Sequence, residues 1–267
     1  MDTPVELRDK PNEHGCSIHG DACLYIGMYA HMDPSYVPHI LACQDENGRI
    51  WRNPEEAKNQ ESPYDHGTSR DMLSGFLLGC VDQPEAVAKL GRYLKKHRRL
   101  SPSGDGRTNP RLTGWAKIGM VLKKHKYPIL KNLGFRGWLY YKISSPFMQL
   151  VNLIEALTVW KGYQLHLVMV AVLFQRALGI KDTYITKLLI KVLDERSPHN
   201  HLVSFIKGDL AAMKFELPHD WNRHRDIRNV YKDSWIYADF SHVDSRRMIS
   251  FASVKFLEMM IKRLESK

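Results

Sequence analysis

Apolar residues recur at helical spacing along most of this chain, and residues 234–239 are the one stretch with clear strand alternation. Met72, Leu73, Phe76, Leu77 and Cys80 would share one side of a helix, and the same spacing returns many times before the C-terminus. Such a pattern leaves each helix with an apolar side that must pack against another helix. It therefore predicts a mainly α fold built of antiparallel helical hairpins.

The helices are expected within a single domain over residues 1–267. They are predicted at residues 22–31, 35–47, 70–79, 85–99, 115–124, 147–160, 167–178, 183–193, 202–206 and 251–264. Three segments lack this periodicity: an irregular lead-in at 1–18, a mobile loop at 100–112 and a polar, aromatic segment at 217–249.

Two of the predicted helices begin in the same way. His19-Gly-Asp21 precedes one, and His66-Gly followed by Ser69-Arg-Asp71 precedes the other. Ser69 is expected to cap the second helix, which places Asp71 in its first turn. Small residues follow at helical spacing in both, Gly27 in the first helix and Gly75 and Gly79 in the second, so another helix could approach closely.

Charge is unevenly distributed along the chain. Residues 1–88 contain 6 Lys and Arg against 15 Asp and Glu, whereas residues 89–142 contain 15 basic residues and one acidic residue. Aromatic residues are interleaved with the basic ones in this second segment. The asymmetry predicts a polyanionic partner.

Several classes of protein are not indicated by the sequence. It has no GxSxG, GxxxxGK[ST], HExxH or GxGxxG motif, and its four cysteines contain no CxxC pair, so no metal site or cofactor is predicted. The longest apolar run, residues 165–173, is too short to cross a membrane. The N-terminus lacks the plan of a signal peptide, so we expect a soluble protein that is cytoplasmic as made.

The helical hairpins with polar residues at their mouths resemble the α/α-toroid proteins, which include many glycoside hydrolases and polysaccharide lyases. The segments that carry this resemblance are His19-Gly-Asp21, Trp51-Arg-Asn-Pro, Ser69-Arg-Asp71, Gly162-Tyr-Gln-Leu-His166 and Ser197-Pro-His-Asn200. The chain is short for a ring of six hairpins, so the resemblance extends to an incomplete ring or a smaller relative.

The resemblance implies cleavage of a polysaccharide, by hydrolysis or by β-elimination, and the basic segment favours an anionic one. Asp21 and Asp71 would be the paired carboxylates of a hydrolase. In an eliminase, Arg70 or Asn200 would neutralise the carboxylate of a uronate, and His66, His166 or Tyr64 would take the proton from C5. The residues expected to bind substrate are His19, Trp51, Tyr64, Trp115, Gln164, His166, Asn200 and Trp221.

Other interpretations of the same residues remain open. Asp21 and Asp71 could simply stabilise helix N-termini, and Trp115, Trp221 and His166 could be core residues. Residues 89–142 could instead bind nucleic acid, with phosphates on the lysines and arginines and bases stacked on the aromatic rings. A structural helical protein of a larger assembly is the third alternative.

Overall fold

A computed structural model describes residues 2–4, 22–62, 67–102, 106–127, 147–158, 162–196, 201–215 and 251–266. These residues form helices and loops, and the one β-bridge among them pairs Gln44 with Ile50. The prediction of a mainly α fold is thus confirmed, while the toroid arrangement stays a prediction. The chain divides into two compact units, one mainly Ser17–Met148 and the other mainly Gln149–Arg176 and Ile180–Lys267. A single domain over the whole chain therefore stays a prediction.

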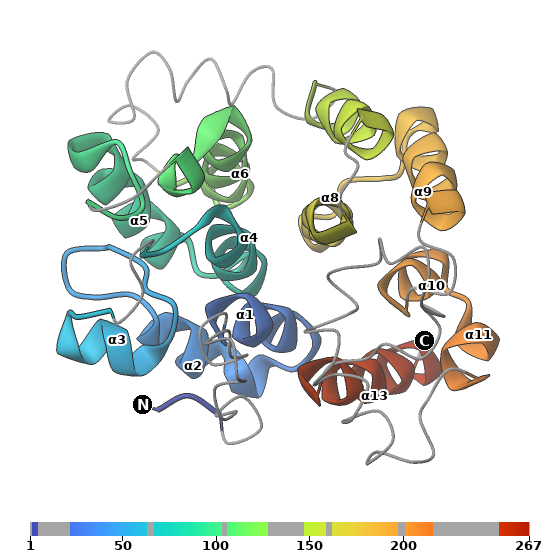
Figure 1. Cartoon of the computed structure of the whole chain (residues 1–267), viewed down its shortest axis with the longest axis horizontal. Helices are drawn as coiled ribbons and strands as arrows, with labels where there is room; N and C mark the ends of the chain where they lie inside the picture. Colours follow the sequence, from blue (N-terminus) through green and yellow to red (C-terminus); the bar gives the residue numbers. More distant parts are fainter. Residues whose placement is uncertain are drawn as a thin grey trace. The chain divides into compact units, whose positions relative to one another are not determined.

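The first unit contains eight helical elements in its described part. They are α1 (Ala22–Met32), η3 (Pro34–Tyr36), α2 (Val37–Ala42), α3 (Pro54–Asn59), α4 (Arg70–Gly79), α5 (Pro84–His97), η4 (Gly106–Thr108) and α6 (Arg111–Lys124) (Figure 1). Most agree with the sequence prediction. Two differences are that α3 was not predicted and that α6 begins at Arg111, inside the predicted loop at 100–112.

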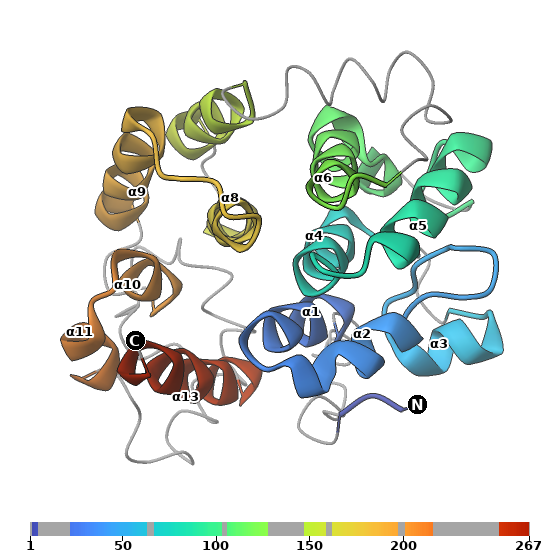
Figure 2. The same ribbon diagram turned by 180° about the vertical axis from the view of Figure 1, so that it is seen from behind.

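The centre of this unit is the contact between α1 and α4, which lie side by side in both views (Figures 1 and 2). Ten of the eleven residues of α1 are buried, as expected for a helix that is apolar on every side. A Cβ atom on Gly27 would lie 1.9 Å from the Gly75 carbonyl oxygen, and one on Gly75 would lie 2.4 Å from the Leu24 Cα. The predicted close approach at these glycines is confirmed.

The contacts also fix the relative direction of the two helices. Near the start of each, the Cys23 thiol donates to the Met72 carbonyl oxygen over 3.6 Å. Near the end of each, a Cβ on Gly79 would lie 2.9 Å from the Gly27 Cα and 3.2 Å from the Ala30 Cβ. Residue numbers therefore rise together along both helices, so α1 and α4 are parallel and their N-termini lie at the same end of the pair.

The second unit is also helical in its described part. It contains most of a helix at 147–158, followed by α8 (Gly162–Ala177), α9 (Tyr184–Arg196), α10 (His201–Lys207), α11 (Leu210–Phe215) and α13 (Phe251–Glu265). Gly179, at a φ of +76°, ends α8 where predicted, whereas α8 begins earlier than predicted and α11 was not predicted. The segment at 217–249 lies outside the described residues.

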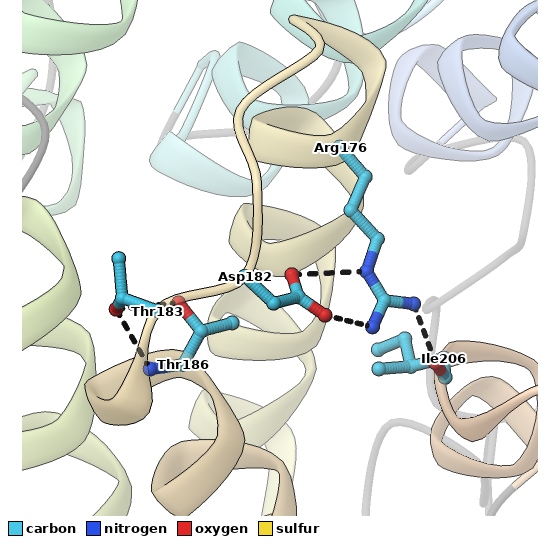
Figure 3. Close-up of polar contacts among 5 residues, drawn as sticks. All are labelled: Arg176, Asp182, Thr183, Thr186 and Ile206. Atoms are coloured by element: carbon cyan, nitrogen blue, oxygen red, sulfur yellow. Dashed lines mark hydrogen bonds and ion pairs between the residues drawn. The ribbon is translucent and has the colours of Figure 1, made fainter.

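Figure 3 shows how the loop between α8 and α9 is held. Arg176, near the end of α8, donates from Nε and Nη2 to the two carboxylate oxygens of Asp182, at 3.3 and 2.6 Å, and from Nη1 to the Ile206 carbonyl oxygen of α10. The Thr183 hydroxyl then accepts the Thr186 N–H and caps α9. The planar guanidinium of α8 thus connects the loop before α9 with α10.

Cys23, Cys43 and Cys80 are buried and not disulfide-bonded. Cys23 and Cys80 both lie in the core of the first unit. Burial raises the pKa of the Cys43 and Cys80 thiols, so both are kept in the neutral form.

Candidate functional site

The candidate site lies at the N-terminal ends of α1 and α4 in the first unit. Ser69 caps α4 as predicted, because its hydroxyl accepts the Asp71 N–H over 3.4 Å. Arg70 and Asp71 follow in the first turn, and both side chains are half-buried. A negatively charged side chain at this position is stabilised by the partial positive charge of the helix N-terminus.

Arg52 connects the two helix N-termini. Its carbonyl oxygen accepts the Cys23 N–H from the first turn of α1 over 2.6 Å, and its Nε donates to the Gly67 carbonyl oxygen over 2.8 Å. Gly67 lies three residues before the start of α4, and the next residue, Thr68, donates from its hydroxyl to the Ile50 carbonyl oxygen. The short segment at 50–52 therefore holds both helix starts in place, a role that the sequence analysis did not predict.

A buried lysine lies one turn further along α4. Lys117 of α6 donates from Nζ to the Ser74 hydroxyl over 3.3 Å, and both side chains are buried. Ser74 is four residues beyond Arg70 and thus on the same side of α4. The sequence signal that could have identified Lys117 is its helical register with Gly114 and Val121, which puts a lysine on an apolar side of the helix.

Trp51 lies in the interior of the unit and is only 3% exposed. Its indole Nε1 donates to Asp45 over 2.9 Å, and the Arg49 guanidinium lies 3.6 Å from the centre of its ring. These contacts cover the face that a sugar ring would need, so the described structure gives Trp51 a packing role. Trp115, on α6, is partly exposed.

The remaining predicted site residues belong to parts of the chain that the structure does not describe. His19, Asp21, Tyr64, His66, Asn200 and Trp221 lie outside the described residues, as do the side chains of Gln164 and His166 at the start of α8. Of the predicted catalytic residues, the structure therefore describes Arg70 and Asp71, and it describes the helix that Asp21 immediately precedes.

No protein-family model, curated protein or solved structure matches this chain. The resemblance to α/α-toroid proteins therefore stays a prediction. Within the described ranges, no group of three or more His, Cys, Asp or Glu side chains could hold a metal ion. No helix of the described part is both long and apolar enough to cross a membrane.

Proposed function

We propose that this protein cleaves an anionic polysaccharide at the paired N-termini of α1 and α4. The parallel packing of the two helices is the observation that carries the proposal. It brings the start of α1, which Asp21 directly precedes in the sequence, to the same end of the unit as Asp71. Antiparallel packing would have put these two positions a full helix length apart.

The spacing of packed helices suits a pair of carboxylates. Neighbouring helix axes are about 8–10 Å apart, and the two carboxylates of a glycoside hydrolase are separated by about 5–9.5 Å. One carboxylic acid would protonate the glycosidic oxygen, and the other carboxylate would attack the sugar or activate a water molecule. Arg70 lies next to Asp71 and would bind an acidic group of the substrate.

The same residues also support the alternative of β-elimination. In that reaction a cation neutralises the carboxylate of a uronate, which makes the proton on C5 acidic enough for a base to remove. Arg70 would be the cation, with His66 or Tyr64 as the base. Two helix N-termini, with Arg52 between them, add positive potential at this end of the pair.

The test compares Asp21→Asn and Asp71→Asn with the wild type on a panel of polyuronates and sulfated glycosaminoglycans. Each variant is expected to lose about 10²–10⁴-fold in rate. Release of reducing ends measures cleavage of either kind, and ultraviolet absorbance of an unsaturated uronate identifies elimination. Asp82→Asn is the matched control, because Asp82 lies just after the opposite end of α4, where its carboxylate pairs with Lys124. Wild-type rates in the Asp71 variant would exclude hydrolysis by the paired carboxylates.

The end of α5 favours a second candidate, binding of nucleic acid. Arg92, Lys95, Lys96, Arg98 and Arg99 are all exposed there. Part of this arrangement has a structural explanation, because cations stabilise a helix C-terminus. Five exposed basic side chains within eight residues could nevertheless contact several phosphates of one polyanion.

A further inference from the structure

The helix at 147–158 exposes a row of apolar side chains. Leu150, Ile154 and Leu157 are spaced by four and three residues and are 44%, 50% and 57% exposed. The other side of this helix is buried and includes Asn152 and Ala156. The helix therefore has a buried side that packs into the second unit and an apolar side that faces solvent.

The neighbouring helix, α9, exposes apolar residues as well. Tyr184 is 81% exposed and Leu188, one turn later, is 39% exposed. The two helices lie side by side in both views (Figures 1 and 2), and two hydrogen bonds connect them. Thr183 donates from its hydroxyl to the Gln149 side chain near the start of both helices, and Arg196 donates to the Ala156 carbonyl oxygen near the end of both.

Lysines lie among these apolar residues. Lys187 and Lys191 are exposed and share the side of α9 that carries Tyr184 and Leu188. Lys191 forms a long ion pair of 3.8 Å with Glu195, whereas the ammonium of Lys187 forms no ion pair with a described side chain. On the helix at 147–158, Glu155 is the acidic residue, and it is half-buried.

Lysines among exposed apolar residues fit a lipid surface better than a protein partner. Lysine is depleted in the buried centre of protein–protein interfaces, because its charge would be removed from water there. At an anionic bilayer the same side chain extends to the headgroups and is attracted to them, while aliphatic and aromatic neighbours enter the acyl boundary. The five apolar side chains and the two lysines, which we call the lysine-flanked apolar face, match the second environment.

We propose that the lysine-flanked apolar face docks on an anionic phospholipid surface. Lys187 and Lys191 would contact headgroup phosphates and carboxylates, while Leu150, Ile154 and Leu157 would enter the boundary with the acyl chains. Docking of this kind is peripheral and reversible, and it is independent of the polysaccharide site proposed in the first unit.

The test is sedimentation of the full chain with vesicles of phosphatidylcholine alone or of phosphatidylcholine mixed with phosphatidylserine. Wild type is expected to sediment with the mixed vesicles and much less with the neutral ones. Lys187→Gln with Lys191→Gln should weaken this binding about tenfold. Leu150→Gln with Ile154→Gln should weaken it by a similar factor, because two apolar side chains no longer enter the boundary. Lys58→Gln with Lys262→Gln is the matched control, with the same loss of charge at exposed positions on α3 and α13, and should bind within about twofold of wild type.

Three results would overturn the proposal. One is wild-type protein that stays in solution with both kinds of vesicle. Another is a control variant that binds as weakly as the Lys187 and Lys191 variant, because attraction would then follow total charge. The third is a wild-type dimer in sedimentation velocity that the Leu150 and Ile154 variant converts to a monomer without any vesicle binding, which would assign the face to a second copy of the chain. All replaced side chains are exposed, and circular dichroism confirms that each variant is folded.

Discussion

Tyr93, on the inner side of α5, is a buried phenol without a hydrogen-bond partner in the structure described for this chain. Its ring stacks on His97 with 4.5 Å between the ring centres. Burial raises the pKa of Tyr93, and the nearby positive charge of Arg49 offsets part of that increase. Burial likewise lowers the pKa of Arg49. The fold therefore favours the neutral phenol.

This pKa shift predicts a loss of stability at alkaline pH. Because the folded-state pKa of Tyr93 lies above the unfolded value of about 10, its contribution is complete below that pH. It is lost as the pH rises through the unfolded and then the folded pKa. Tyr93→Phe should therefore be at least as stable as the wild type in denaturant unfolding at pH 7 and lose less stability above about pH 10. The control is Tyr184→Phe, at an exposed position, which should follow the wild-type curve. Identical alkaline curves for Tyr93→Phe and wild type would contradict the prediction.

At the candidate site, the sequence predicted contacts between neighbouring residues but not those between distant ones. Ser69 and Asp71 were predicted in their observed positions because a helix cap depends on residues that are close in sequence. Arg52 and Lys117 were missed because their contacts, with Gly67 and Ser74, arise only after distant segments pack. Trp51 was predicted to bind substrate, but it is buried and the Arg49 guanidinium lies over its ring.

At the scale of helices, the glycine contact between α1 and α4 is the feature that tolerates an added side chain least. On both sides of the contact the nearest atoms belong to the backbone, so no side chain can rotate away to make room. The sequence indicated this contact through its glycines at helical spacing. It gave weaker signals for α3, which has only six residues and is too short to show periodicity, although Asn53 caps it and Pro54 occupies its first turn.

Gly75→Ala is expected to destabilise the first unit by about 3 kcal/mol or more, the upper end of the range for overpacked cores. The added methyl would have to displace the Leu24 backbone, so the two helices must separate. Denaturant unfolding measures the effect as a lower midpoint. Gly106→Ala is the control, because no atom lies within 4 Å of a Cβ at that position. A Gly75 variant as stable as this control would show that the helices are further apart than described.

At the scale of the whole molecule, the chain carries a formal net charge of +10, concentrated in residues 89–142. The sequence predicted this concentration directly, since charge depends on composition alone. Which basic residues reach solvent depends in addition on how the helices pack. The basic residues at the end of α5 are exposed. Lys117 is buried, because it lies on the inner side of its own helix, α6.

The exposed group at the end of α5 predicts salt-dependent binding of polyanions. Lys96→Glu with Arg98→Glu should weaken binding to duplex DNA or heparin and reduce the slope of log affinity against log salt by about 2. Fluorescence anisotropy at several salt concentrations measures that slope. Lys58→Glu with Lys262→Glu changes the net charge equally at exposed positions on α3 and α13, and its slope should stay near the wild-type value. Equal slopes for the two variants would assign the effect to total charge.

The parallel pairing of α1 and α4 also constrains the order in which the chain can fold during synthesis. Contacts such as that between Cys23 and Met72 join residues 49 positions apart, so the side of α1 that carries Gly27 stays uncovered until α4 has been made. With ribosomes adding about 5–20 residues per second, this almost wholly apolar helix waits roughly 2–10 seconds for its neighbour. During that interval its glycine side is open to other nascent chains and to chaperones.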